Sequence, residues 1–467
     1  MRRSRLVVAG GLAAALLLAG ALLRGFPAAA AGDAPAPDSV SSVHIPLQQS
    51  TLSNGLRVIL SVDHSAPTYS ICITYDVGSR NEHTGRTGFA HLFEHMMFEG
   101  SENVGKGEHM ILIYDNGGGM NGTTNKDRTN YFETLPANQL DLGLYLEADR
   151  MRSLAINQAN LDNQRNAVQE ERRLGVDNQP YGKSFEVLDE MAYDNPAYQH
   201  STIGSMADLN AASVQDFAAF FKTYYAPNNA VLTLVGDFEP AEALAKIKKY
   251  FEGIPRQPAP PQPDMTEPQQ TAERRKTIDD GFAQLPRLDI VYKVPQAETP
   301  DWYALDVLGD ILVKGQSSRL YQELVKDKEL AVNVSGGPEE SRGPSLFHLT
   351  ALVRPGKEVS DVEKAIEDSV ERAKADGVTQ EEVDKVVMQD RTDLIRQDQS
   401  TLSRAVVIGE LAVYYHDPDL INTRIDKYHR VTLADVKRVA QQYLTQNNRT
   451  VLITMPKAAA TAARSGQ

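Results

Sequence analysis

The sequence predicts an α+β protein built from two similar α/β-layered domains, each a mixed sheet packed with helices. Three observations support this fold class. Strand-like and helix-like segments alternate along the chain, the order of the first half recurs in the second, and a proline-rich stretch separates the halves. The chain has 467 residues, which is enough for two or three domains with buried cores.

In the first half, strands are expected where β-branched and aromatic residues gather, and helices where apolar residues recur at helical spacing. Asn54-Gly55 between apolar flanks indicates a hairpin within residues 51–59, and residues 123–135 alternate like one strand until Pro136. The other expected strands are 69–77 and 230–235, and the expected helices are 87–98, 107–114, 137–153, 159–174, 213–225 and 241–251.

The clearest boundary is the segment 251–269, which contains six prolines and few apolar residues and is therefore not expected to form a helix or strand. After it, strands are expected at 287–292, 330–335, 346–353 and 449–455, and helices at 301–312, 318–326, 359–376, 380–415 and 433–443. These patterns predict an N-terminal domain at 44–252, a linker at 253–275, a C-terminal domain at 276–457 and a tail at 458–467.

The N-terminus is typical of a targeting segment. Arg2, Arg3 and Arg5 precede an apolar run and the small residues 28–31, which predicts a secretory signal peptide at 1–31 and a periplasmic or secreted protein. An uncleaved membrane anchor is the less favoured alternative, and Arg2-Arg3 leaves twin-arginine export open. Residues 32–43 are expected to form a flexible leader.

Composition excludes several classes of function. The formal net charge of -14 argues against a nucleic-acid binder, and removal of residues 1–31 takes away four arginines and no acid, so the charge falls to -18. The single cysteine, Cys72, cannot form an internal disulfide or a cysteine-based metal cluster. Any metal ion must therefore be held by His, Asp or Glu.

The segment 88–97 carries the strongest chemical signal. His91 and His95 are four residues apart, so on a helix they share one face, with Glu94 beside them. Two imidazoles one turn apart can hold Zn²⁺, and an adjacent carboxylate can take a proton from water. His-x-x-Glu-His is the inverted form of the zinc-peptidase motif. The alternative is a pair of core histidines, but three titratable groups on one apolar helix would be costly to bury without a metal.

A third ligand is expected from the helix at 159–174. On this helix Glu171 shares its face with Gln164, Ala167, Val168 and Leu174, whereas Glu170 lies on the polar side. We therefore expect Glu171 to point into the fold. The alternative for Glu171 is a salt bridge with a neighbouring arginine on the same helix.

The motif His91-Leu92-Phe93-Glu94-His95, followed 76 residues after His95 by Glu171, resembles the pitrilysin family of zinc metallopeptidases, which includes insulin-degrading enzyme and mitochondrial processing peptidase. Residues 118–124 and 129–136 resemble the substrate-binding edge strand of that family. The resemblance covers essentially all of the chain after its leader, and its second half looks like the metal-free domain of the family. The resemblance implies that the chain forms one half of a clamshell.

The resemblance implies a zinc-dependent endopeptidase with one Zn²⁺ per chain, held by His91, His95 and Glu171. Glu94 would be the general base for the zinc-activated water and would pass the proton to the leaving amine. An extended peptide would add to the strand around Asn121, Gly122 and Tyr131 through main-chain hydrogen bonds.

Two departures from the family pattern matter. The family often places a second glutamate seven residues before the third ligand, where this chain has Gln164, which we expect to hydrogen-bond behind the ligands. In the complementary half, a motif like Arg-Glu-Lys-Arg-Gly-Leu-Ala-Tyr supplies an Arg and a Tyr that stabilise the tetrahedral intermediate. The matching stretch here begins at Val325 and ends at Val332, so both functional positions are valine.

The missing pair predicts a heterodimer in which this chain carries the zinc and a related chain without a zinc site brings the Arg and Tyr. Two alternatives stay open. One is a non-catalytic peptide-binding or assembly subunit of the same architecture, and the other is a histidine-based metal-binding protein without peptidase activity. The sequence names neither the substrate nor the partner.

Overall fold

Two sheets organise the chain in the computed structural model, which describes residues 44–457. The predicted signal peptide (1–31), leader (32–43) and tail (458–467) lie outside the described residues. The strands of the first sheet are β1 (Gln48–Thr51), β2 (Arg57–Val62), β3 (Thr68–Tyr75), β4 (Gly119–Thr124), β5 (Thr129–Pro136) and β6 (Ala230–Gly236). Those of the second sheet are β7 (Arg274–Asp280), β8 (Arg287–Val294), β9 (Ala331–Pro338), β10 (Ser345–Val353) and β11 (Arg449–Pro456).

Apart from the additional edge strand β1 in the first sheet, both sheets have the same topology. The first has the order β1-β2-β6-β3-β5-β4 and the second the order β7-β11-β8-β10-β9. The pairs β2–β6 and β7–β11 are parallel, and every later pair in each order is antiparallel. Strand β9 therefore occupies the position in the second sheet that β4 occupies in the first, at an edge. This repeat confirms the predicted pair of similar α/β-layered domains.

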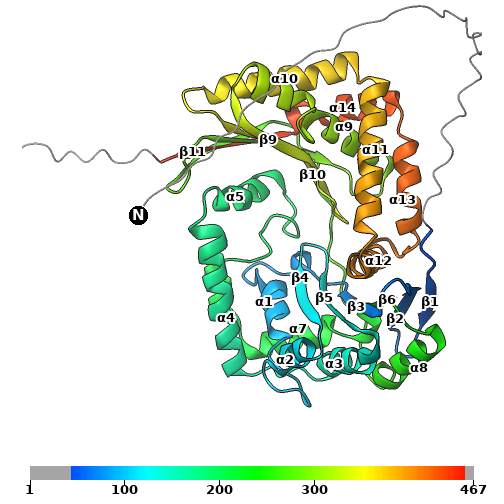
Figure 1. The fold of residues 1–467 in the computed structure, drawn as a ribbon. Helices are drawn as coiled ribbons and strands as arrows, with labels where there is room; N and C mark the ends of the chain where they lie inside the picture. Colours follow the sequence, from blue (N-terminus) through cyan, green and yellow to red (C-terminus); the bar gives the residue numbers. More distant parts are fainter. Residues whose placement is uncertain (1–43, 458–467) are drawn as a thin grey trace, which may run out of the picture. The chain divides into compact units, whose positions relative to one another are not determined.

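Helices cover the sheets, and the apolar cores lie between them (Figure 1). In the first half these are α1 (Phe89–Met96), α2 (Glu108–Asp115), α3 (Leu140–Arg152), α4 (Gln158–Arg172), α5 (Gly182–Ala192), α6 (Met206–Ala211), α7 (Val214–Tyr224) and α8 (Pro240–Phe251). In the second half they are α9 (Pro300–Val313), α10 (Val359–Asp376), α11 (Gln380–Gln397), α12 (Thr401–Tyr415), α13 (Leu420–His429) and α14 (Leu433–Tyr443). Short 3₁₀ or π turns are η1 (Ser79–Asn81), η2 (Ala137–Gln139), η3 (Arg173–Asp177), η4 (Pro227–Asn229), η5 (Tyr321–Asp327) and η6 (Gln446–Asn448).

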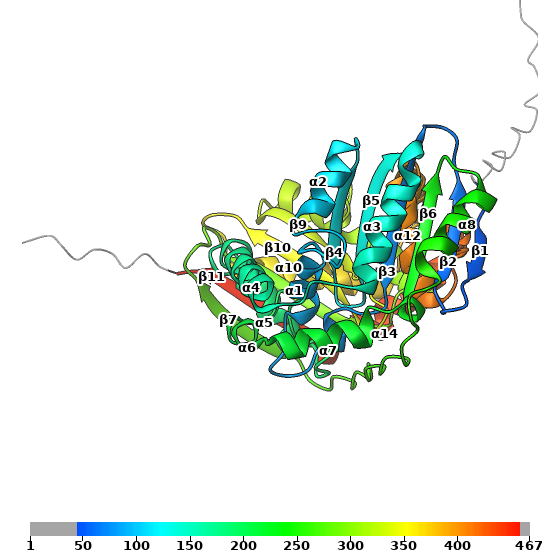
Figure 2. The ribbon, with the colours of Figure 1, turned by 90° about the horizontal axis from the view of Figure 1, so that it is seen from below.

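One helix from each half of the sequence packs on the sheet of the other half. Helix α12 packs on β3 and β6 of the first sheet, on the face opposite α3 and α8 (Figure 2). Helix α5 packs on β8 and β11 of the second sheet, where Leu188 and Tyr198 join a small apolar cluster. The exchange joins the halves through buried apolar contacts. Among the described residues, no helix is long and apolar enough to cross a membrane.

Two predicted elements are corrected by the structure. The helix expected at 380–415 is two helices, because the Ser400 side chain accepts the N–H of Ser403 and caps α12 as a new helix. The strand expected at 123–135 is the hairpin β4–β5, because the Asn125 side chain accepts the N–H groups of Asp127 and Arg128 and closes a turn. Periodicity alone does not reveal either break, since both depend on a single polar side chain.

Other elements were not predicted. These are the separate helices α5, α6 and α13 and the strand β7. The short helix expected at 318–326 is present as the π turn η5. Between α8 and β7 the proline-rich segment has no regular secondary structure. It nevertheless contacts both halves, because the Asn195 amide donates to the carbonyl groups of Asp264 and Thr266, and Gln270 donates to the Arg449 carbonyl.

A buried polar cluster lies between α2, α3 and β5. His109 Nε2 is 3.1 Å from Glu133 Oε2, and Glu147 forms an ion pair with Arg150, whose guanidinium lies 4.6 Å from the centre of the Tyr131 ring. Arg150 supplies the positive charge that balances Glu147. Burial raises the pKa of Glu133 to about 8 and that of Glu147 to about 6, and it lowers the pKa of His109 to about 3.

We predict that this cluster makes the stability of the protein depend on pH. Because burial raises the pKa of Glu133 from 4.5 to about 8, the folded chain keeps a proton that the unfolded chain releases over this range. Rising pH therefore favours unfolding. Glu133→Gln mimics the protonated acid. The urea midpoint of this variant, relative to that of the wild type, should therefore increase as the pH rises from 5 to 8.

The exposed Glu170→Gln change is the control, because it should follow the wild type at every pH. A difference between Glu133→Gln and the wild type that stays constant from pH 5 to 8 would contradict the assignment of a buried proton to this cluster.

Candidate metal centre

Helix α1 carries the His-x-x-Glu-His motif and is fixed by its buried side. Phe93 stacks on Phe217 of α7 and lies 4.2 Å, centre to centre, from the ring of Tyr225. The Glu82 carboxylate, which precedes the helix, accepts the N–H groups of Gly88 at 2.9 Å and Ala90 at 2.7 Å. These bonds satisfy donors that a helix start leaves unpaired, since Gly88 has no side chain to cap it. The histidines are thus presented from a rigid element.

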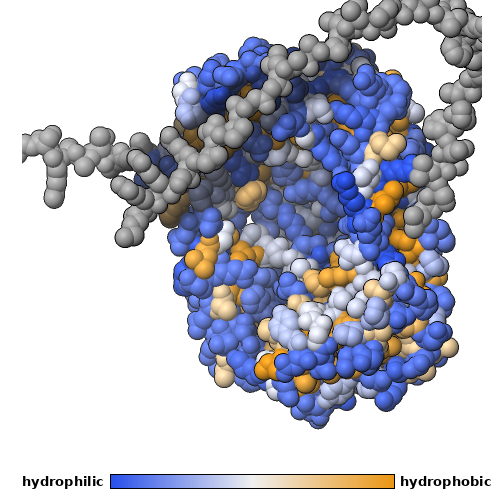
Figure 3. All heavy atoms as spheres, viewed as in Figure 1, coloured by the Kyte–Doolittle hydropathy of each residue, from blue (hydrophilic) through white to orange (hydrophobic). Residues whose placement is uncertain are grey.

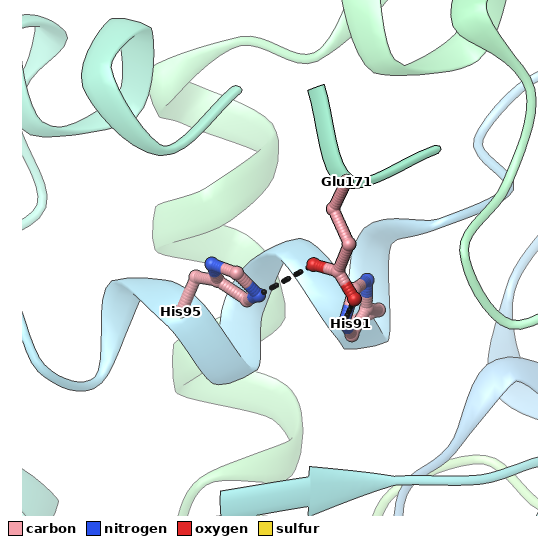
Figure 4. A group of neighbouring side chains, drawn as sticks. All are labelled: His91, His95 and Glu171. Carbon is pink, nitrogen blue, oxygen red and sulfur yellow. Dashed lines mark ion pairs between the residues drawn. The ribbon is translucent and has the colours of Figure 1, made fainter. Parts of the chain in front are cut away.

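Helix α4 carries Glu171 on its last turn. Asn157 caps the start of the helix by accepting the N–H of Asn160, and after Arg172 the chain continues into the π turn η3. The Glu171 side chain points toward the two histidines, as Figure 4 shows. On the same side, Ala167 and Leu174 are exposed rather than buried, so this stripe of α4 borders an open space and not the core. The prediction that Glu171 shares a buried apolar face with Ala167 and Leu174 is therefore wrong.

One junction sets the spacing between α1 and α4. Arg172 Nη1 donates to the carbonyl of Gly204 at 2.6 Å, and the guanidinium also pairs with Glu186. Gly204 in turn lies against Gly88, so closely that a Cβ on Gly204 would fall 2.4 Å from the Gly88 Cα. Both glycines have positive φ values, 74° and 85°, which glycine adopts without strain. The helix that ends at Arg172 is thereby tied to the start of α1.

Three groups that can each donate a lone pair converge between these helices. His91 Nε2 is 3.7 Å from Glu171 Oε1, and His95 Nε2 is 3.4 Å from Glu171 Oε2 (Figure 4). One ligand atom from each of the three residues lies within 4.8 Å of the other two. Two imidazoles and one carboxylate are the donor set of many catalytic zinc sites.

The electrostatics of His91 and Glu171 also fit a cation, whereas the hydrogen bond to Glu171 raises the pKa of His95 against the effect of burial. Burial, with His95 beside it, lowers the pKa of His91 to about 4, so the ring is neutral and can act as a ligand. The nearby His95 lowers the pKa of Glu171, which keeps this carboxyl ionised. His91 Nδ1 is buried without a hydrogen-bond partner among the described residues. A zinc ion fits this set of residues by donor type and by spacing.

Glu94 lies beside the convergence point and touches strand β4. Its carboxyl is buried, and Thr124 Oγ1 of β4 donates to Glu94 Oε2 at 2.6 Å. Burial raises the pKa of Glu94, which the Thr124 hydrogen bond opposes. A Cβ on Gly122 would lie 3.2 Å from Glu94 Cγ and 3.1 Å from the Tyr131 ring, so a small residue is needed where β4 passes the carboxylate. A carboxyl with this placement can exchange a proton with a group bound along β4.

The residues expected to bind substrate differ in accessibility. Asn121 is exposed on the edge strand β4, and Gly122 is the residue that lies against Glu94. Tyr131 is a correction, because it is fully buried in the inner strand β5, where it packs on Tyr75 and Arg150. A buried ring cannot contact a peptide. Tyr131 instead packs beside Gly122, because the two residues are register partners on neighbouring strands.

Gln164 lies behind His95, where the sequence places it. Its Oε1 atom is 3.2 Å from His95 Nδ1, on the side of the ring away from Glu171. Sequence reasoning missed three residues that hold the site: Glu82, Thr124 and Arg172. No local pattern distinguishes these three from surface residues. Glu82 acts on the start of the helix that follows it, whereas Thr124 and Arg172 act on residues 30 and 32 positions away.

The surface around the site is largely hydrophilic. Figure 3 shows a hollow between the regions that carry the labels α5 and α1 in Figure 1, with hydrophilic residues over most of this face. Smaller hydrophobic areas interrupt it.

Comparison with known proteins gives consistent matches over most of the chain. Residues 57–205 match the family described as Insulinase (Peptidase family M16), and residues 211–389 match the Peptidase M16 inactive domain. The zinc protease PqqE of Helicobacter pylori is 33% identical over 327 residues, which is 69% of this chain and 74% of that protein.

Two further comparisons extend these matches. The crystal structure of a protease from Helicobacter pylori has a TM-score of 0.85 at 30% identity and covers 88% of this chain and 100% of that one. The probable mitochondrial-processing peptidase subunit beta of Arabidopsis thaliana is 25% identical over 264 residues, 56% of this chain and 49% of that protein. The matched region therefore spans about half the length of that relative.

The resemblance inferred from the zinc motif is confirmed, and relatives named zinc proteases support a metallopeptidase family. With matches to both domains and a relative that is 33% identical over most of its length, the chain belongs to peptidase family M16.

Proposed function

We propose that the chain is a zinc-dependent endopeptidase that cleaves extended peptides. The observation that carries this proposal is the convergence of His91, His95 and Glu171 within 4.8 Å, with Glu94 beside an edge strand. Zinc bound by these residues supplies Lewis-acid polarisation of a carbonyl group and activation of water. We assign one zinc ion to the chain.

In this mechanism Glu94 moves the proton. Because Thr124 occupies Oε2, we assign the proton-accepting role to Oε1, which takes a proton from the attacking water and returns it to the leaving amine. The raised pKa of Glu94 suits a group that must both accept and release a proton near neutral pH. The Thr124 hydrogen bond holds the carboxylate still while this happens.

Strand β4 is the proposed docking edge for the peptide. Among the described strands it pairs only with β5, so its other side can accept an additional strand. Main-chain pairing of this kind positions the scissile bond with little demand on side-chain sequence. Gly122 leaves room for a peptide backbone to pass close to Glu94.

We further propose that this chain works with a second, related subunit. Val325 and Val332 stand where the resembled family carries an Arg and a Tyr, and Val332 is 45% exposed on β9. A relative of this chain is named as the beta subunit of a peptidase, which supports a paired assembly. The N-terminal pattern of residues 1–31 supports a periplasmic or secreted location for this assembly.

Replacing Glu94 tests the catalytic role. Glu94→Gln should retain zinc, because the three ligands are untouched, and should lower kcat roughly 10²- to 10⁴-fold, the range for loss of a general base. The measurements are metal content by mass spectrometry and initial rates on a fluorogenic peptide. Glu170→Gln, an exposed neighbour of Glu171, is the matched control and should keep both properties. Wild-type rates in Glu94→Gln would remove Glu94 from the mechanism.

Reconstitution tests the second subunit. For the chain alone, the activation barrier for cleavage should be higher by roughly 3 to 4 kcal/mol, the cost typical for loss of one oxyanion donor. A related chain of similar size, with Arg and Tyr at the positions of Val325 and Val332, should restore the rate and co-migrate in size-exclusion chromatography. Full activity of the isolated chain would argue against a partner, whereas zinc binding without cleavage in either sample would favour a non-catalytic subunit.

A further inference from the structure

A chain of hydrogen bonds runs from His95 to a buried carboxylate that has no role in the mechanism above. Gln164 Oε1 is 3.2 Å from His95 Nδ1, and Gln164 Nε2 donates to Glu99 Oε1 at 2.6 Å. The Glu99 side chain is 8% exposed, and its Oε2 atom lies 2.5 Å from the Lys106 ammonium. The chain thus begins at a candidate ligand and ends at an exposed lysine.

The donors and acceptors along this series of hydrogen bonds allow only one direction of donation. A lysine ammonium only donates, and an ionised carboxylate only accepts, so Glu99 can bond to Gln164 only through the amide NH₂ group. Asn163 Oδ1 repeats the same polarity, because it accepts from Lys106 at 3.3 Å and from Gln164 Nε2 at 2.9 Å. The orientation of the Gln164 amide is therefore set from two sides.

This orientation fixes the proton on the histidine ring. With its NH₂ group committed to Glu99 and Asn163, Gln164 turns its carbonyl oxygen to His95, and Nδ1 must carry a hydrogen to bond to it. In the neutral ring with this tautomer, Nε2 keeps a lone pair. Nε2 lies 3.4 Å from Glu171, whose carboxylate is the competing acceptor that draws the hydrogen toward Nε2.

We infer that Gln164, Glu99 and Lys106 form a relay that holds His95 in the tautomer able to bind a metal ion through Nε2. Glu99 and Lys106 are positioning residues, since they act on the ring through Gln164. The relay also accounts for the neutral residue at 164, where the resembled family has a glutamate, because the carboxylate stands one hydrogen bond farther out, at Glu99. The inference rests on the proposed zinc site.

The expected effect is on metal affinity. Groups that orient a ligand histidine from behind typically contribute 10- to 100-fold to metal binding, because the ring must otherwise select its tautomer and orientation when the ion binds. The relay removes this selection step before the metal arrives.

Nitrogen NMR of the metal-free full chain tests the relay without reference to activity. With ¹⁵N-labelled histidine, at a pH above the titration of the ring, wild-type His95 should show the Nδ1–H form. Glu99→Gln replaces the acceptor-only group by one that can also donate, so the Nε2–H form should gain population. Gln164→Met removes the acceptor itself, and zinc affinity, measured by chelator competition, should fall roughly 10- to 100-fold in this variant.

Two further variants guard the result. Glu102→Gln is the matched control, because Glu102 is 69% exposed and its nearest cation is Arg152 at 3.8 Å, and it should leave both measurements unchanged. Lys106→Met, at a half-exposed lysine, tests the outer end of the relay if Glu99→Gln does not fold.

The outcomes are distinct. An Nε2–H form in the wild type, or a tautomer and zinc affinity unchanged in Glu99→Gln, would overturn the relay. If the wild type bound no zinc, the proposed function would fail, while the tautomer measurement would still judge the relay.

Discussion

The structure depends on one constraint: helices α1 and α4 must hold three lone-pair donors within 4.8 Å of each other, although His95 and Glu171 are 76 residues apart in the sequence. Burying three polar groups together costs free energy, which the contact between His95 and Glu171 offsets only in part. The packing of the surrounding elements has to supply the energy that keeps it together. The contact of Gly88 with Gly204, extended to α4 by the Arg172 hydrogen bond, is a close contact in this packing.

The same constraint explains how strand β4 is held. The turn after β4 is held by three contacts. Lys126 pairs with Asp189 of α5, Arg128 pairs with Glu410 of α12, and Asp127 accepts the N–H of Arg342. These partners come from both halves of the sequence. An edge strand is usually a mobile part of a sheet, yet here buried and partly buried charges fix its end. Thr124, the last residue of β4, can therefore hold Glu94 in one position.

Much of the centre could be predicted from the sequence, because the spacing of His91, Glu94 and His95 and the phase of Glu171 are properties of single helices. The same logic failed where tertiary contacts decide. Leu174 is apolar but exposed, because it lies in the π turn η3 and not on α4. Tyr131 lies in the inner strand β5, which the expected single strand did not separate from β4. The Glu99 contact was out of reach, since it joins residues on two elements whose packing no local pattern encodes.

The repeat shows how one architecture can carry chemistry in one half and a closed core in the other. In both sheets the edge strand packs on a helix from earlier in the same half, β4 on α1 and β9 on α9. Helix α1 places His91, Glu94 and His95 at this position, whereas α9 fills it with Leu305, Leu308 and Leu312, all buried. Fold alone therefore does not assign function. On the equivalent edge, Val332 is 45% exposed and its side chain cannot donate a hydrogen bond, so under the proposed function a donor at this position has to come from another surface.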